Sequence, residues 1–176
     1  MNTREFGKKA QRIFIYAVFV LYIMFLFKLL ILSRVSFGET ERSINLIPFK
    51  SIGEYLFSGD NEIRRFSYSN IAGNLLAFVP LGVYIYTLSG RLRVSVLTVV
   101  SVSFGAELIQ GIFGLGAADI DDLILNSLGG LIGIFACMLL RRLLNIEKRL
   151  YVVLTVVSAA GLIPLLYLLF VIQLRL

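Results

Sequence analysis

The chain has 176 residues, of which 58% are apolar and 16% are charged. Soluble domains are about half apolar and a quarter charged, so this composition excludes an ordinary soluble domain. The length suits one membrane domain over residues 1–176. Histidine is absent and Cys137 is the one cysteine, which excludes histidine-based metal sites, Ser-His-Asp triads and intramolecular disulfides. The net charge of +6 comes from basic groups between apolar runs, a pattern of membrane topology and not of nucleic-acid binding.

Five apolar runs are each long enough to cross a membrane as a helix, which takes roughly 20 residues. Backbone polar groups must be satisfied inside lipid, so each run is predicted to be helical. The runs cover residues 13–32, 69–88, 94–113, 122–140 and 151–172. The sequence therefore predicts an all-α, polytopic membrane bundle of about five transmembrane helices.

Basic residues predict the orientation of these helices. They gather in the N-terminal tail, at residues 91–93 and at residues 141–149, whereas residues 114–121 carry two aspartates and no basic residue. The positive-inside rule then places the N-terminus in the cytoplasm and residues 33–68 outside. The amphipathic middle of this outer segment, residues 44–57, lies at the membrane interface, dips back toward the bundle or only packs over the helix ends. Pro48 breaks any single helix through it.

Polar residues within the predicted spans share one depth. With a rise of about 1.5 Å per residue, Lys28, Asn74, Glu107 and Asn126 each lie roughly 6–9 Å below the outer surface, on four different helices. Polar residues at such depth are costly in lipid and usually face a bundle interior or a cavity. The shared depth predicts an outward-facing polar pocket.

Helical spacing extends these positions into stripes, because residues three or four apart lie on one helix face. The stripes are Ser103, Glu107 and Gln110; Asn70 and Asn74; and Asp122 and Asn126. Gly129 and Gly133 form a GxxxG spacing, which predicts close helix packing.

The membrane-embedded polar residues also have structural interpretations. Glu107 either pairs with Lys28 or Arg34, or is protonated and hydrogen-bonded. Asn74 and Asn126 would join helices through their amides. Lys28 would otherwise extend its amine toward the outer surface.

Three acids, Asp119, Asp121 and Asp122, stand at the start of the fourth run. Asp119 is predicted to cap that helix, with Asp122 at the third helical position, because carboxylates there accept free N–H groups. Capping needs one or two acids and leaves a third unexplained. Carboxylate oxygens suit Mg²⁺ or Ca²⁺, so the three acids are also candidate ligands of a divalent cation. No other cofactor is expected.

Four motifs, in this order and spacing, resemble the VanZ family. They are NLIPF (45–49), NIAGNLLAFVPLG (70–82), SFGAELIQ (103–110) and DIDDLILNSLGGLIG (119–133). The resemblance covers about residues 45–135. It implies a multi-pass protein of the bacterial cell membrane and envelope. The family's namesake confers low-level resistance to teicoplanin, a lipoglycopeptide antibiotic, apart from the pathway that rewrites the peptidoglycan stem terminus.

The resemblance also implies which positions matter. The motif positions are Asn45, Pro48, Asn74, Pro80, Glu107, Gln110, Asp119, Asp122 and Asn126. Many relatives carry a basic residue shortly before the DxDD segment, where this chain has glycine and alanines at 116–118. A cation that replaces it would be Arg34, Lys50 or Lys28.

Two functional hypotheses follow. In the first, the polar layer binds a lipid-linked cell-wall intermediate or the antibiotic without turnover, in contact with membrane lipids. In the second, an intramembrane enzyme modifies a lipid-linked or cell-wall substrate, with Glu107 as general acid or base and Asp119, Asp121 or Asp122 as its partner. Amide side chains favour recognition and no nucleophile stands out, so binding is preferred. A transporter is disfavoured because the five runs show no inverted repeat.

Overall fold

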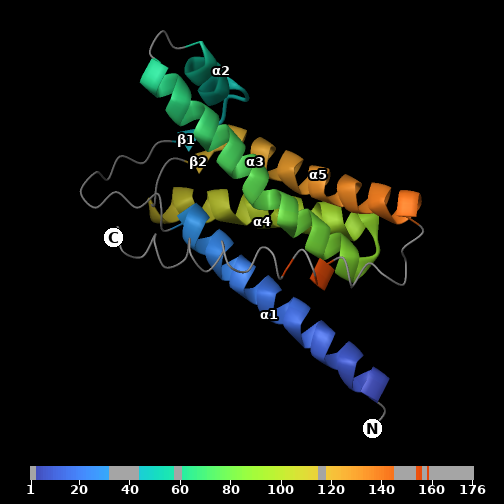
Figure 1. The fold of residues 1–176 in the computed structure, drawn as a ribbon. Coiled ribbons are helices and arrows are strands. Elements are labelled where there is room, and N and C mark those ends of the chain that lie inside the picture. The colour runs from blue at the N-terminus through green and yellow to red at the C-terminus, as the bar shows by residue number, and fades with distance from the viewer. Residues whose placement is uncertain are drawn as a thin grey trace. The chain divides into compact units, whose positions relative to one another are not determined.

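The computed structural model describes residues 3–31, 44–57, 61–114, 118–144, 154, 155 and 158. The elements are α1 (Thr3–Ile31), β1 (Ile44–Asn45), α2 (Lys50–Leu56), α3 (Asn61–Ser89), α4 (Leu92–Phe113), β2 (Ala118–Asp119) and α5 (Ile120–Leu144) (Figure 1). The two strands have two residues each, so the described chain is almost entirely helical. The predicted all-α class is confirmed.

Four of the described helices contain stretches long and apolar enough to cross a membrane. These are Lys9–Ile31, Tyr68–Ser89, Leu92–Phe113 and Ile120–Leu143. They match the first four predicted spans and confirm a polytopic membrane helical fold. Some helices run past the predicted spans, α3 by eight residues at its start, because a helix keeps its hydrogen bonds beyond the lipid. The predicted fifth span, 151–172, lies outside the described residues apart from three isolated positions.

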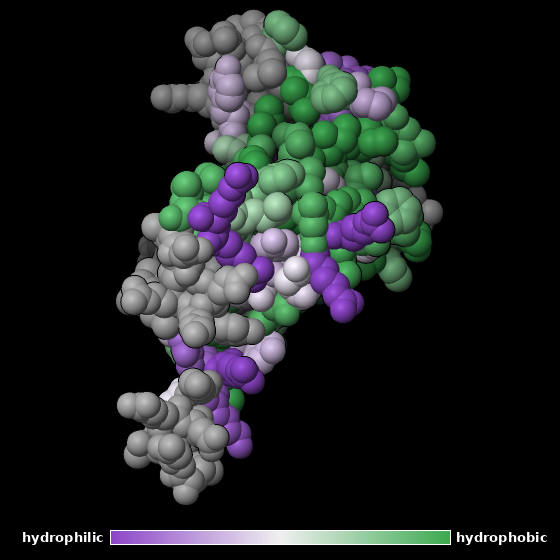
Figure 2. Space-filling view, turned by 90° about the vertical axis from the view of Figure 1, so that its right-hand side faces the viewer, coloured by the Kyte–Doolittle hydropathy of each residue, from purple (hydrophilic) through white to green (hydrophobic). Residues whose placement is uncertain are grey.

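Large apolar side chains cover the helix surfaces. Hydrophobic residues (green) predominate on the face of the molecule seen in Figure 2, with hydrophilic residues (purple) in small groups. On α4, for example, Leu97 is 67% exposed and Phe104 is 52% exposed. Soluble proteins rarely expose such large apolar areas, whereas lipid-facing helices do so along their length. The surface therefore agrees with the predicted membrane location.

The chain divides into two compact units, residues 1–28 with 140–176 and residues 29–139. In the first unit, α1 buries Ile15, Tyr22 and Leu26, which recur at helical spacing on one face. The Nε2 of Gln11 donates to Oγ1 of Thr155 at 2.9 Å. This unit thus joins the start of the chain to residues beyond α5.

In the second unit, α3, α4 and α5 lie side by side (Figure 1), and glycines set the α3–α5 distance. A Cβ on Gly129 would lie 2.0 Å from the carbonyl oxygen of Leu75, and one on Gly133 would lie 2.1 Å from that of Val79. Only hydrogen atoms fit at these positions. The close packing predicted from the GxxxG spacing is confirmed.

A tight turn brings α4 back along α3. Gly90 has a φ of 64°, which glycine adopts without steric cost, and its N–H donates to the carbonyl of Tyr86 at 3.0 Å. Further along α4, Val99 is fully buried, and its Cγ1 lies 2.2 Å from where a Cβ on Gly130 would be. Helix α4 therefore packs a side chain directly onto the backbone of α5 at Gly130, whereas α3 meets α5 backbone to backbone.

The described part of the segment between α1 and α3, residues 44–57, joins the bundle through a parallel strand pair and is called the outer segment below, after its predicted location. Ile44 pairs with Ala118, and Asn45 pairs with Asp119. After this pair the chain turns through Pro48, α2 begins two residues later, and α2 packs against α3. The predicted helix break at Pro48 is confirmed. The strand pair places the outer segment at the start of α5.

Replacement of Gly129 by alanine tests this packing. Gly129→Ala is expected to lower the free energy of unfolding by about 1–3 kcal/mol, the usual cost of overpacking. Gly73→Ala is the matched control, because nothing lies within 4 Å of a Cβ there. It should be neutral or stabilise by up to about 0.5–1 kcal/mol, since alanine favours a helix over glycine. Thermal unfolding in detergent measures both, and equal stability of the two variants would contradict the close α3–α5 contact.

Candidate functional site

The carboxylate of Asp121 holds the outer segment by its backbone. Oδ1 accepts the N–H of Phe49 at 2.5 Å, and Oδ2 accepts the N–H of Ile52 at 3.1 Å. The first N–H groups of a helix have no partner inside that helix, and Phe49, the residue before α2, supplies no capping side chain. Asp121, which is 1% exposed, therefore caps α2 from the first turn of α5. This role accounts for the third acid that capping of α5 alone left unexplained.

The same contact offsets a strained backbone. Phe49 has a φ of 63°, a left-handed conformation that costs a non-glycine residue roughly 1–2 kcal/mol. A hydrogen bond to a charged group contributes about 1.5–3 kcal/mol, so the Asp121 contact is large enough to compensate. Two further bonds fix the turn, from the N–H of Ile47 to Oδ1 of Asn45 at 3.2 Å and from the N–H of Lys50 to the carbonyl of Ile47 at 3.3 Å.

The carboxylate of Asp119 joins three partners. Oδ1 accepts the N–H of Asp121 at 2.9 Å and the Nδ2 of Asn45 at 3.1 Å. The hydroxyl of Ser51 donates to Oδ2, and Nδ2 of Asn45 also donates to that hydroxyl at 2.9 Å. The bond to the N–H of Asp121 is the predicted cap of α5, which is thereby confirmed. The other bonds attach the outer segment through its side chains.

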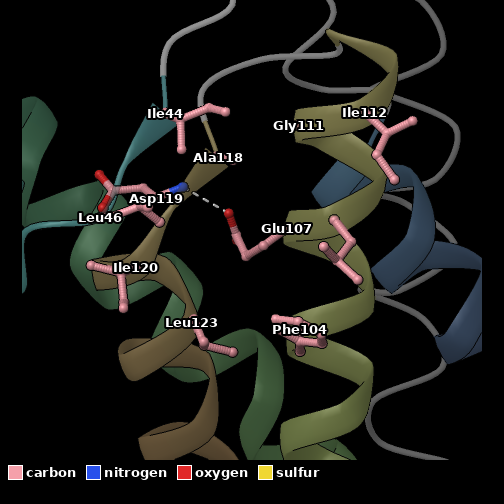
Figure 3. A pocket seen from close by; sticks show the side chains of 11 residues that line it. Ile44, Leu46, Phe104, Glu107, Gly111, Ile112, Ala118, Asp119, Ile120 and Leu123 are labelled. Atoms are coloured by element: carbon pink, nitrogen blue, oxygen red, sulfur yellow. Dashed lines mark hydrogen bonds between the residues drawn. The ribbon is translucent and has the colours of Figure 1, made fainter.

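Glu107 links α4 to β2, the strand that contains Asp119. Its Oε2 accepts the N–H of Asp119 at 2.9 Å, shown as a dashed line in Figure 3. The Glu107 side chain is 9% exposed. One carboxylate of the predicted layer is therefore bonded to the backbone where β2 leads into α5.

Three other members of the polar layer lie between helices. Nδ2 of Asn74 donates to Oδ1 of Asp122, which ties α3 to α5 as an interhelical amide bond was predicted to do. Ser103 is fully buried, and its hydroxyl donates to the carbonyl of Leu123 at 3.5 Å. Asn126, one turn beyond Asp122, is also fully buried, and neither of its amide atoms bonds to a described residue.

Gln110 and Asn70 complete the predicted stripes. Nε2 of Gln110 donates to the carbonyl of Leu30 at 2.7 Å, and the side chain is 1% exposed. Because the last carbonyls of a helix lack partners within it, Gln110 satisfies the end of α1. Asn70 is half-buried on α3, one turn before Asn74.

The three predicted cations have different positions. Lys50 is exposed on α2, where its Nζ lies 4.0 Å from Oε1 of Glu54. Lys28 belongs to the first unit, whereas the polar layer described above belongs to the second. Arg34 lies outside the described residues. That any of them binds a ligand stays a prediction.

A cavity of about 340 Å³ lies beside Glu107. Small-molecule pockets measure roughly 300–1,000 Å³, so this volume suits a ligand or part of one. The lining residues are Ile44, Leu46, Phe104, Glu107, Leu108, Gly111, Ile112, Ala118, Asp119, Ile120 and Leu123. Figure 3 shows Glu107 extending from α4 across to β2, between apolar side chains of α4 and α5. The cavity is more apolar than the pocket predicted from the sequence, because internal hydrogen bonds engage most of the polar layer.

The apolar wall of this cavity was not anticipated from the sequence. Phe104, Leu108 and Ile112 are spaced four residues apart on α4 and are 52%, 46% and 64% exposed. Apolar residues inside an apolar run carry no sequence signal that separates a cavity wall from an ordinary lipid-facing stripe. Because these side chains are both lining and exposed, the cavity opens on the lipid-facing side of α4.

Comparison with known proteins decides the family. A family model described as VanZ/LLP1 matches residues 13–141. The chain is also 30% identical to Protein VanZ of Enterococcus faecium over 138 residues, which is 76% of each protein. The chain belongs to the VanZ/LLP1 family. No solved structure matches it significantly. The family match starts earlier than the motifs, which begin at Asn45, and so includes most of α1.

In this VanZ-family chain, the three candidate metal ligands face different partners. Asp121 accepts hydrogen bonds from backbone N–H groups of the outer segment, and Asp119 accepts them from the side chains of Asn45 and Ser51. Asp122 accepts one from the side-chain amide of Asn74 on α3. Among the residues that the structure describes, no group of three histidine, cysteine, aspartate or glutamate side chains is placed to hold a metal. The three acids therefore serve as hydrogen-bond acceptors, two for the outer segment and one for α3.

A double-mutant cycle on Asn74 and Asp122 tests the interhelical bond. Asn74→Ala and Asp122→Ala should each destabilise the protein, and the two effects should be coupled by about 0.5–3 kcal/mol, because both variants remove the same buried hydrogen bond. The matched control is Lys50→Ala with Glu54→Ala, whose side chains are 48% and 65% exposed. That pair should couple by less than about 1 kcal/mol. Thermal unfolding supplies all the values, and strict additivity at Asn74 and Asp122 would show that the bond does not form.

Proposed function

We propose that this chain is a multi-pass protein of the bacterial cell membrane that lowers the amount of teicoplanin held at the cell surface. It does so by binding a lipid-linked cell-wall component, or the antibiotic itself, without chemical change. The observation that carries this proposal is the apolar cavity beside Glu107, open toward the lipid. Membership in the VanZ/LLP1 family supports the link to teicoplanin, through the resistance that the family's namesake confers.

The chemistry of the cavity supports an amphiphilic ligand. Leu108, Leu123 and Phe104 offer an apolar surface to a hydrocarbon chain. Glu107 offers a carboxylate to hydroxyl, amide or ammonium donors at the polar end of that chain. A lipid-linked cell-wall intermediate and a lipoglycopeptide both combine a hydrocarbon chain with such donors, so both fit this description.

The surroundings of the acids favour binding over catalysis. Oε2 of Glu107 is engaged by the N–H of Asp119, while the carboxylate of Asp119 bonds to Asn45 and Ser51. A general acid and base pair needs both carboxyls to reach the reacting groups. The hydroxyl of Ser103, the candidate nucleophile on the same stripe, is fully buried and donates to a backbone carbonyl.

The proposed orientation follows from charge. Two basic residues, Arg91 before α4 and Arg93 in its first turn, lie at the helix ends opposite to β2. The positive-inside rule assigns these arginines to the cytoplasm, so the cavity end of the bundle faces outward. There it meets the outer leaflet, where lipid-linked cell-wall precursors and the antibiotic are found together.

Fluorescent teicoplanin on whole bacteria tests the proposal. Cells with the wild-type protein should bind less antibiotic than cells without it, at matched membrane levels. Glu107→Gln keeps an acceptor for the N–H of Asp119 but removes the charge, and Leu108→Trp fills the cavity. Both variants should restore antibiotic binding to the level of cells without the protein. Leu97→Trp makes the same change three turns away on the lipid-facing side of α4 and should behave as wild type.

Two results would each overturn one part of the proposal, the function or its site. If the wild-type protein leaves antibiotic binding unchanged, the function is wrong. If the wild-type protein lowers binding and Glu107→Gln and Leu108→Trp do so equally well, the function stands but the cavity is not its site. Extraction and mass analysis of the cell-wall lipids from the same cells separates binding from turnover, because binding leaves their masses unchanged.

A further inference from the structure

Four consecutive apolar residues of the outer segment are exposed. They form the LIPF loop, Leu46–Ile47–Pro48–Phe49, in which Leu46 is 71% exposed, Ile47 61% and Phe49 63%. Pro48 is exposed as well. A run of three or four exposed apolar residues is unfavourable in water unless something covers it.

The backbone of the LIPF loop is fixed in this exposed position. Its N–H groups at Ile47 and Phe49 donate to Asn45 and Asp121. Because Asp121 is buried in the first turn of α5, the loop is attached to the bundle and presents its side chains outward. The exposure of the LIPF side chains therefore follows from the hydrogen bonds that fix the backbone of the loop.

The position of the loop points to lipid as the covering partner. β1 pairs with β2, so the loop stands at the end of the bundle where α4 finishes and α5 starts. Leu46 lines the cavity together with Leu108 and Ile112, which face lipid on α4. The apolar surface of the loop is thus continuous with the lipid-facing surface of a membrane-spanning helix.

Charge around the loop indicates how it would bind. No charged residue occurs in residues 44–49, and the charges of Lys50 and Glu54 cancel on the adjacent helix. Phe57, at the other end of α2, is 89% exposed and adds an aromatic ring. Apolar and aromatic residues without net charge are suited to the boundary between headgroups and acyl chains, independently of anionic lipid.

We propose that the LIPF loop inserts into the outer leaflet at the boundary between headgroups and acyl chains. It anchors the outer segment to the membrane surface and holds the segment beside the mouth of the cavity. The insertion is driven by apolar burial and not by attraction to anionic lipids. This inference does not depend on which ligand the cavity binds, nor on the effect on teicoplanin.

Tryptophan fluorescence tests the insertion directly, because the chain contains no tryptophan. Ile47→Trp and Phe49→Trp each place a single indole reporter in the full-length protein. The proteins are reconstituted into phosphatidylcholine vesicles, with lipids brominated either near the top of the acyl chain or near its terminal methyl. Ile132→Trp, at the middle of the α5 span and 48% exposed, supplies a reference for deep lipid exposure.

Both loop reporters should lose about half of their fluorescence to bromines near the top of the chain and less to the deeper bromines, as expected roughly 5–10 Å into the interface. The Ile132→Trp reporter should show the opposite order. Replacement of half of the phosphatidylcholine by phosphatidylglycerol should change nothing.

Other outcomes contradict the proposal. If both loop reporters resist brominated lipid and are quenched by aqueous iodide as free tryptophan is, the loop faces water and its partner is not lipid. If brominated lipid quenches them only when phosphatidylglycerol is present, attraction to anionic lipid drives insertion and the apolar account is wrong.

Discussion

The carboxylate of Asp121 is the contact on which the outer half of the second unit depends. Its two oxygens accept two backbone N–H groups, from Phe49 and Ile52, and no bulk water is needed to satisfy them. A hydrogen bond to a charged group contributes about 1.5–3 kcal/mol, so loss of this one side chain would remove two such bonds and leave the left-handed Phe49 uncompensated. The position of residues 49–52 thus depends on one acid of α5, in addition to the strand pair and the bonds of Asp119.

Other acids at the start of α5 hold further parts of the site by hydrogen bonds in the same way. Asp119 bonds the side chains of the outer segment, and Asp122 bonds Asn74 of α3. Glu107 joins α4 to this group by accepting the N–H of Asp119, the residue before α5. These acids bring three segments to one place, and the cavity forms where apolar walls meet beside Glu107. Polar residues hold the segments together by hydrogen bonds, and apolar residues form most of the cavity wall.

The sequence predicted those features that depend on composition and spacing. Span length determined four helices, and the Gly129–Gly133 spacing indicated the close contact of α5 with α3. Both the cap by Asp119 and the amide link at Asn74 were predicted, because side chains with a known preference fill those positions.

Other features lay beyond the sequence for a physical reason. The partners of Asp121 are backbone N–H groups, which every residue except proline carries, so no residue type marks them. The wall formed by Phe104, Leu108 and Ile112 has the same composition as a lipid-facing stripe. The exposure of the LIPF loop likewise depends on a turn whose shape is determined by a distant carboxylate. These features depend on contacts between residues far apart in the sequence, and the groups that make the contacts have no distinctive residue type. A sequence pattern therefore does not predict them.

Hydrogen exchange at single amides tests the role of Asp121 most directly. In the wild-type protein the N–H groups of Phe49 and Ile52 should be protected. In Asp121→Ala both should exchange at least about tenfold faster, because each loses a bond to a charged acceptor worth about 1.5–3 kcal/mol. Amides in the middle of α3, such as that of Phe78, should stay unchanged. Equal exchange at Phe49 and Ile52 in the two proteins would contradict the account, since it would mean that the outer segment is held in place without this carboxylate.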